Sequence, residues 1–331
     1  MFLKTVILLL ASLPQWTVLR TEQREGYSCQ HIEYKAGDDR VPAYLLIPDD
    51  GEPHPGLVLL HDHGARFDIG KEKLVRPMAD APEHIRRSAR QWVDDGFDGV
   101  FFADRLAALG YVVIVPDVLY WGSRSSEKCR QWSRMQFGAG PAEGIRQLKK
   151  EVYEGQRAVY DSLAAKGIVW AEKTLREDAE AARLLASLPY VRKDRIGCFG
   201  WSMGAHRAWL LAAFCEEVKT GVALCWMTLK STQAQPPSAS DYSMMIPTLR
   251  ESHDFPDIAR RLCPKPFLFL NGLNDKLFPT PETARAFRRM QEIYKENGAG
   301  NLLGTEFFEG GHHCGAAQQE RVIRYLDYYL K

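Results

Sequence analysis

Short apolar runs alternate along this chain with longer stretches that have helical periodicity. The apolar runs cover residues 56–60, 111–115, 196–199, 221–225 and 267–270. Each run is typical of a strand buried on both faces of a parallel sheet. Helical patterns cover residues 103–109, 145–188 with an interruption at Gly167, 258–262 and 316–330. Strands that alternate with helices predict an α/β fold with one doubly wound, mostly parallel sheet.

The first part of the chain has a different pattern. Residues 32–34 and 41–47 are β-type runs separated by the turn-forming residues 36–39. This spacing predicts an antiparallel hairpin ahead of the parallel strands. We therefore expect residues 31–331 to form a single domain that begins with this hairpin.

Two segments are too long to be ordinary connections between a strand and a helix. Residues 66–102 are rich in charge and include a candidate helix at 83–93, and residues 121–141 contain two tryptophans and several arginines. Both are expected to be cap-like insertions over the carboxyl ends of the strands, where open sheets bind ligands. Residues 227–256 are a third candidate.

The N-terminus allows two interpretations. Lys4 precedes an apolar run at 6–13, which could be a short signal segment. No small-x-small cleavage site follows, so the favoured interpretation of residues 1–30 is a helical extension packed on the domain. No other run reaches the roughly 20 apolar residues of a membrane span.

Charge and cysteine content narrow the class of protein. The 331 residues carry 43 Lys and Arg against 42 Asp and Glu, a formal net charge of +1. This balance gives no excess of basic residues that would favour binding to nucleic acid or an anionic membrane. It favours a small-molecule or neutral-polymer substrate. The seven cysteines are scattered, odd in number and without CxxC spacing, so we expect buried free thiols. Free thiols favour the cytoplasm, with secretion as the alternative.

The chemistry centres on the sequence GWSMG at 200–204. A strand-like run enters this motif and a helical pattern leaves it, which is the context of a nucleophile elbow. Glycine on both sides of the serine leaves room for the sharp turn. Ser202 is therefore the candidate nucleophile.

A serine nucleophile needs a base and a group that orients the base. Asp275 follows the strand-like run 267–270, whereas its rivals Asp254 and Asp257 have no buried strand before them. His312 follows the Gly-Gly turn after residues 305–308 and is the favoured base. His313 is the alternative. A further histidine, His206, lies on the helix after the elbow and is expected to be structural.

Two backbone N–H groups would form the oxyanion hole. Met203, the residue after the nucleophile, is expected to supply one of them, and Ala65, in the loop after residues 56–60, the other. That loop also contains His61-x-His63, which could be a metal-binding pair. No third ligand lies nearby in the sequence, so we expect no metal.

Taken together, GWSMG, NGLNDKLFP, GGHH and LHDHG resemble the α/β-hydrolase superfamily. The phrases VPAYLLIP, GYVVIVPD and WGSR are similar to its dienelactone-hydrolase-like and acetyl-xylan-esterase-like branches. The resemblance covers residues 33–330 and implies an α/β-hydrolase fold, a Ser-Asp-His chain order and no cofactor. Dienelactone hydrolases themselves use a cysteine nucleophile, and Ser202 stands in its place here.

These features predict a serine carboxylesterase that hydrolyses a small ester, with an acetyl or other short acyl group that a carbohydrate could carry. The alternatives are a prolyl-oligopeptidase-type peptidase and a non-catalytic binding module. Trp121 and Trp201 are candidate substrate contacts, although packing is the ordinary role of such tryptophans. Arg66 and Lys71 could bind a carboxylate on the substrate, and a solvated charged loop is the simpler interpretation.

Overall fold

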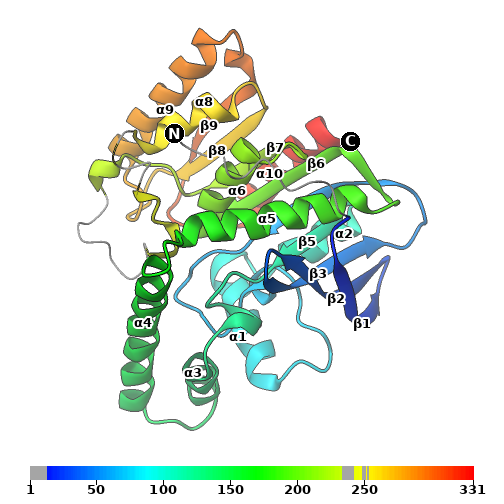
Figure 1. Ribbon diagram of the computed structural model, residues 1–331, viewed down its shortest axis with the longest axis vertical. Helices are drawn as coiled ribbons and strands as arrows, with labels where there is room; N and C mark the ends of the chain where they lie inside the picture. The colour runs from blue at the N-terminus through cyan, green and yellow to red at the C-terminus, as the bar shows by residue number, and fades with distance from the viewer. Residues whose placement is uncertain (1–12, 233–241, 248–250, 252) are drawn as a thin grey trace.

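One nine-stranded sheet organises the chain (Figure 1). The computed structural model describes residues 13–232, 242–247, 251 and 253–331. The strands of this sheet are β1 Trp16–Arg24, β2 Tyr27–Ala36, β3 Asp39–Pro48, β4 His54–Leu60, β5 Val112–Pro116, β6 Val191–Trp201, β7 Val218–Leu224, β8 Phe267–Gly272 and β9 Leu303–Phe308. Their spatial order is β1-β2-β3-β5-β4-β6-β7-β8-β9.

The sheet changes character between β3 and β5. The pairs β1–β2, β2–β3 and β3–β5 are antiparallel, and every pair from β5–β4 to β8–β9 is parallel. The predicted mostly parallel sheet with an N-terminal antiparallel hairpin is thereby confirmed. Because the strands from β5 to β9 run in one direction, the loops after them meet at one edge of the sheet.

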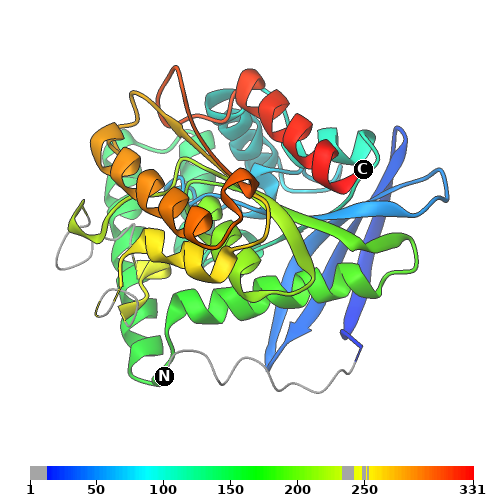
Figure 2. The same ribbon diagram turned by 90° about the horizontal axis from the view of Figure 1, so that it is seen from above.

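Helices cover both faces of the sheet (Figure 2). One face carries α5 Trp170–Ser187, α6 Met203–Phe214, α8 Ala259–Leu262 and α9 Thr280–Glu296, and the other carries α1 Glu83–Gly96, α2 Phe102–Ala108 and α10 Ala316–Leu330. In β8, Phe267 and Phe269 enter the first core, and Leu268 and Leu270 enter the second. Burial on both faces explains why these strands are continuous apolar runs.

The N-terminal prediction needs a correction. Residues 16–24 form β1 and pair antiparallel with β2, so a helix over residues 1–30 is wrong for this part. β1 is an edge strand with mostly exposed side chains, and it lacks the apolar alternation that would have revealed it. The apolar run at 6–13 lies almost wholly outside the described residues.

The predicted insertions have helices of their own. The first contains a short 3-10 turn, η1 Lys71–Lys73, and α1, which confirms the helix expected there. The second contains η2 Gly122–Arg124 and α3 Glu127–Phe137. The helical stretch predicted at 145–188 is divided into α4 Ala142–Ala164 and α5, with a left-handed Gly167 between them (φ +69°). Figure 1 shows α3 beside α4 at one end of the molecule.

The third candidate insertion also contributes short helical turns. They are η3 Lys230–Thr232, η4 Tyr242–Met244 and η5 Phe255–Ile258. Tyr242 packs its ring on Tyr160 of α4 at a centroid distance of 5.0 Å, and Ser243 lies against the Met203 sulfur at 3.3 Å. The turn η4 therefore connects α4 to the start of α6.

The described residues contain no helix that is both long and apolar enough to cross a bilayer. All seven cysteines lie within the part of the chain that the structure describes, and all are free thiols. Six are buried and Cys263 is half-buried, in agreement with the prediction from their spacing.

Candidate active site

Ser202 lies in a strained turn between β6 and α6. Its backbone has φ +57° and ψ −126°, a combination that a non-glycine residue adopts only where its surroundings enforce it. A Cβ on Gly200 would lie 2.0 Å from the Gly204 carbonyl oxygen, and a Cβ on Gly204 would lie 1.9 Å from the Leu60 carbonyl oxygen. Both glycines are thus required by close backbone contacts, as the motif predicts.

Asp275 and His312 form a hydrogen-bonded pair. His312 Nδ1 lies 2.8 Å from Asp275 Oδ2, and the Asp275 side chain is fully buried. The other carboxylate oxygen accepts N–H groups from Leu277 at 2.9 Å and Phe278 at 3.1 Å. These two backbone bonds fix the carboxylate, so it can hold one orientation of the imidazole.

The His312 ring is held between aromatic side chains beside the elbow. Its centroid lies 5.3 Å from that of Trp201, the neighbour of Ser202, and 5.8 Å from that of Phe278, which it stacks on. His313, the alternative base, faces elsewhere and pairs through Nε2 with Asp98 Oδ1 at 3.1 Å. Among the two histidines, the structure therefore brings His312 to the acid and not His313.

The sequence predicts Cys225 as a buried thiol but does not predict its place beside the Asp275–His312 pair. Cys225 directly follows β7, is fully buried, and places its sulfur within 4.8 Å of donor atoms of Asp275 and His312. Its burial and the nearby Asp275 carboxylate raise the pKa of the thiol, so it stays protonated. Zinc binding would need the thiolate and would break the Asp275–His312 hydrogen bond, so we assign no metal to this cluster. Because Cys225 ends a predicted parallel strand, the sequence could have placed it at this edge of the sheet.

The loop after β4 differs from its prediction. The N–H of Ala65 donates to Nδ1 of His63 at 3.1 Å, so it is engaged within the loop and is not directed to an oxyanion. Within the described residues, the N–H of His63 makes no hydrogen bond. The N–H of Met203 lies in the first turn of α6, where helix N–H groups have no partner in the helix.

The imidazole rings of the two histidines of this loop are structural. His61 Nδ1 faces the Asp62 carbonyl at 3.0 Å and its Nε2 accepts the Val118 N–H at 3.2 Å, which uses both ring nitrogens. His63 uses its nitrogens on Ala65 and, at 3.4 Å, on Gln156. Burial lowers the pKa of His63 to about 3. A metal site built on this pair is therefore not supported.

His206 is also structural, as expected. It is buried and packs edge-on against Trp209 and Trp226 at centroid distances of 4.7 and 4.5 Å. Burial, and to a lesser extent Arg207, lowers the pKa of His206 to about 3. The ring is thus neutral at the pH of the cell.

The aromatic and charged candidates for substrate contact have mixed outcomes. Trp121 is fully buried and donates its Nε1–H to the His63 carbonyl at 3.1 Å, so it packs and supports the loop instead of facing a substrate. Trp201 is nearly buried and lies against His312. The expectation of a solvated loop is wrong for Arg66 and Lys71, because both side chains are buried.

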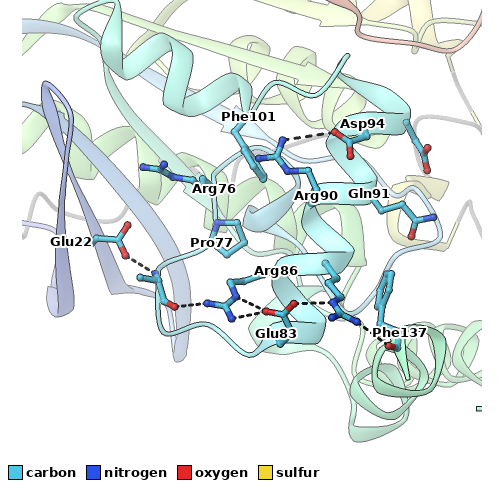
Figure 3. A pocket seen from close by; sticks show the side chains of 13 residues that line it. Glu22, Arg76, Pro77, Glu83, Arg86, Arg90, Gln91, Asp94, Phe101 and Phe137 are labelled. Carbon is cyan, nitrogen blue, oxygen red and sulfur yellow. Dashed lines mark hydrogen bonds and ion pairs between the residues drawn. The ribbon is translucent and has the colours of Figure 1, made fainter. Parts of the chain in front are cut away.

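A separate groove of about 970 Å³ lies away from these residues (Figure 3). It is bounded by Glu22 of β1, by α1, and by Phe137 at the end of α3. Arg86 and Arg87 in its wall are both paired with Glu83. No member of the Ser202, Asp275 and His312 set lines this groove, so it is not the site of the chemistry.

Parallel strands thus bring a strained serine, a histidine–carboxylate pair and a backbone loop to one edge of the sheet, which defines an α/β-type hydrolase. Residues 96–326 match the family model described as "Dienelactone hydrolase family". The chain belongs to the dienelactone hydrolase family and is an enzyme of the hydrolase class.

One curated relative and two solved structures are similar to this chain. The chain is 24% identical over 316 residues to "Putative hydrolase YtaP" of Bacillus subtilis (strain 168), with 94% of this chain and 91% of that protein covered. A structure titled as a putative acetyl xylan esterase from Bacteroides fragilis NCTC 9343 has a TM-score of 0.66 at 19% identity, covering 90% of this chain and 70% of that one. A glucuronoyl esterase from Solibacter usitatus has a TM-score of 0.61 at 11% identity, covering 96% and 86%. At these identities the structures show a shared fold.

Proposed function

We propose that this protein is a serine esterase with Ser202 as nucleophile, His312 as general base and Asp275 as the group that orients the base. The observation that carries the proposal is the 2.8 Å contact between His312 Nδ1 and the buried Asp275 carboxylate, beside the strained serine elbow. A carboxylate in this position keeps the proton on Nδ1 and leaves Nε2 free to accept the serine proton.

The reaction follows from these roles. His312 Nε2 takes the proton of Ser202 Oγ as the oxygen attacks the ester carbonyl, and the resulting imidazolium is stabilised by Asp275. The same proton passes to the departing alcohol, leaving an acyl group on Ser202. Water activated by His312 then hydrolyses the acyl-enzyme and returns the serine.

The tetrahedral intermediates need N–H donors at their oxyanion. We propose the N–H of Met203, as the sequence predicts, and the N–H of His63 in place of that of Ala65. The replacement is supported by the bond that Ala65 makes to His63 Nδ1. A helix N-terminus also carries a partial positive charge, which favours an oxyanion at Met203.

A short acyl ester, such as an acetylated carbohydrate, is the proposed substrate class. The near-zero net charge favours a neutral substrate, and the names of the acetyl xylan and glucuronoyl esterases of similar fold point to esters on carbohydrates. A panel of acetylated sugars, short p-nitrophenyl esters, lactones and a dipeptidyl amide would separate this class from a peptidase.

The nucleophile is tested with Ser202→Ala. This variant should lower kcat for p-nitrophenyl acetate by at least about 10³-fold, because no other group can form the acyl-enzyme. Ser187→Ala is the matched control, since Ser187 Oγ only caps the end of α5 by donating to the Leu184 carbonyl. Ester hydrolysis that is equal in Ser202→Ala and wild type would refute the assignment.

A further inference from the structure

Lys73 is a lysine with no exposed surface, although a buried ammonium is costly unless it is well partnered. Its Nζ donates to the Asp62 carbonyl at 2.8 Å and to the His63 carbonyl at 2.7 Å, and lies 3.4 Å from Asp62 Oδ2. All three acceptors belong to the loop after β4. We propose that Lys73 is a positioning residue that holds this loop in the conformation needed to bind the oxyanion. The inference rests on the proposed esterase function.

The geometry of the peptide unit explains how a lysine could do this. In a trans peptide the C=O and the N–H point in opposite directions. The Asp62 and His63 carbonyls both face Nζ, so the N–H groups of His63 and Gly64 are directed to the opposite side. His61 Nδ1 and Trp121 Nε1 add one further bond each to the same two carbonyls. The donors that bind the Asp62 and His63 carbonyls thus fix the direction of the His63 and Gly64 N–H groups on the opposite side of the loop.

The loop needs this restraint because its own backbone is strained. Gly64 and Ala65 have φ values of +52° and +51°, and Ala65 is not a glycine. The loop also begins directly against the elbow helix. A Cβ on Gly204 would lie 3.1 Å from the His61 carbonyl oxygen, and Arg207 of α6 donates to that oxygen at 3.3 Å. A shift of the loop would therefore change the position of His63 relative to Met203.

Asp62 connects Lys73, through two tryptophans, to the proposed base His312. Its Oδ1 accepts the Nε1–H of Trp92 at 3.2 Å, and the Lys73 ammonium lies 5.2 Å from the Trp92 ring centroid. Trp92 in turn packs on Trp201 at 5.8 Å, and Trp201 packs on His312 at 5.3 Å. Contacts thus run continuously from the buried ammonium to the proposed base.

Several charged and titratable groups surround Lys73. Asp62 and Asp68 favour its ammonium form, and Arg66 opposes it. Burial lowers the pKa of Lys73 to about 8, and burial raises that of Asp62. His61 and His63, whose pKa values are lowered by burial, are neutral at this pH. The hold of Lys73 on the loop after β4 should therefore weaken as the pH rises through about 8, when the ammonium loses its charge.

The test compares Lys73→Met with Lys71→Met. Lys71 is equally buried and two residues away, but its Nζ contacts Asp117, Ser123 and Glu72 instead of the loop. Lys73→Met should lower kcat for p-nitrophenyl acetate by about 10- to 100-fold with KM within about 3-fold, since oxyanion binding acts in the transition state. A trifluoromethyl ketone that forms a tetrahedral adduct should lose affinity in parallel. Lys71→Met should keep kcat within about 3-fold per folded molecule.

Lys73→Arg provides a second test that does not depend on how well Lys73→Met folds. Arginine stays charged at every accessible pH, so this variant should lack the loss of kcat that wild type shows above pH about 8. The proposal is overturned if Lys73→Met keeps wild-type kcat, if Lys71→Met loses as much, or if the alkaline limb is the same in Lys73→Arg. A wild type that neither hydrolyses esters nor reacts with a fluorophosphonate would instead overturn the proposed function, and this inference with it.

Discussion

Each candidate catalytic residue owes its position to a few specific contacts. The sharp turn at Ser202 is possible because Gly200 and Gly204 have no Cβ, which would collide with the Gly204 and Leu60 carbonyl oxygens. Asp275 is held by two backbone N–H groups and His312 by the aromatic rings of Trp201 and Phe278. Pre-organisation of this kind removes the entropy cost of aligning the groups during reaction.

The two adjacent histidines offer a matched comparison at this scale. His312→Ala should lower kcat for a short ester by at least about 10³-fold, since the nucleophile loses its base. His313→Ala should keep kcat within about 5-fold, because His313 pairs with Asp98. Steady-state kinetics on both folded variants decides the matter. A greater loss in His313→Ala would mean that the base is misassigned.

The sequence alone placed the candidate catalytic residues at the edge where the structure brings them together, but it did not predict the residues that support them. The elbow and Asp275 each follow an apolar run, and His312 follows a Gly-Gly turn, so these patterns are visible without a structure. The burial of Trp121 and Lys73 depends on where distant segments pack, and the bond from the Ala65 N–H to His63 Nδ1 depends on the left-handed backbone at Ala65. Hydropathy and motif spacing carry no information on such contacts, and for this reason the structure does not support Ala65 as the second oxyanion donor or Trp121 as a substrate contact.

At the scale of elements, Arg66 joins the two inserted helices α1 and α3. Its guanidinium donates to Gln91 of α1 at 2.8 Å and lies 5.9 Å from the Trp132 ring centroid and 5.6 Å from that of Phe137, both on α3. The side chain is buried, so its contacts replace those that water would make. Arg66 therefore acts as a structural connection within the insertions.

Arg66→Met should destabilise the fold more than it affects chemistry. Loss of the hydrogen bond and of the two cation–π contacts is expected to cost about 1–3 kcal/mol, partly offset by the apolar methionine. The thermal midpoint should fall by a few degrees while kcat for a short ester stays within about 3-fold. Differential scanning fluorimetry and ester kinetics measure both. A loss of kcat without a change in the midpoint would instead point to substrate contact.

Strands with a continuous apolar run were predicted well, whereas the exposed edge strand β1 and the amphipathic helix α9 were not predicted. The strands β4, β5, β7 and β8 are buried on both of their faces, and the helix after the elbow packs against the sheet, so each leaves a continuous apolar pattern in the sequence. β1 is held at the sheet edge by pairing with β2, and most of its side chains face solvent. Backbone pairing leaves no trace in hydropathy, so an edge strand of this kind is missed.

At the scale of the whole molecule, three buried neutral histidines should make stability depend on pH. Burial lowers the pKa of His63 and His206 to about 3 and that of His61 well below its usual value. Below pH about 6.5 the unfolded chain takes up protons that the folded protein does not bind, so stability falls as the pH drops from about 6.5 towards 3.

His206→Phe isolates one of these contributions. His206 packs between tryptophans, where a phenylalanine ring can take its place. Between pH 6.5 and 5, one such histidine lowers the free energy of unfolding by at most about 2 kcal/mol. In a domain of this size this lowers the thermal midpoint by about 3 °C. The fall in thermal midpoint between pH 7 and 5 should be smaller in His206→Phe than in wild type by about that amount. An equal fall in both proteins would show that His206 is not buried in the neutral form.

The central claim for the whole molecule is that an acyl group passes through Ser202. Rapid quenching of the enzyme with p-nitrophenyl acetate, followed by peptide mass spectrometry, tests it most directly. The account predicts one acetyl group on Ser202, formed at the rate of the p-nitrophenol burst and absent from Ser202→Ala. An active wild type that carries no acetyl group on Ser202, or carries it on another residue, would contradict the account.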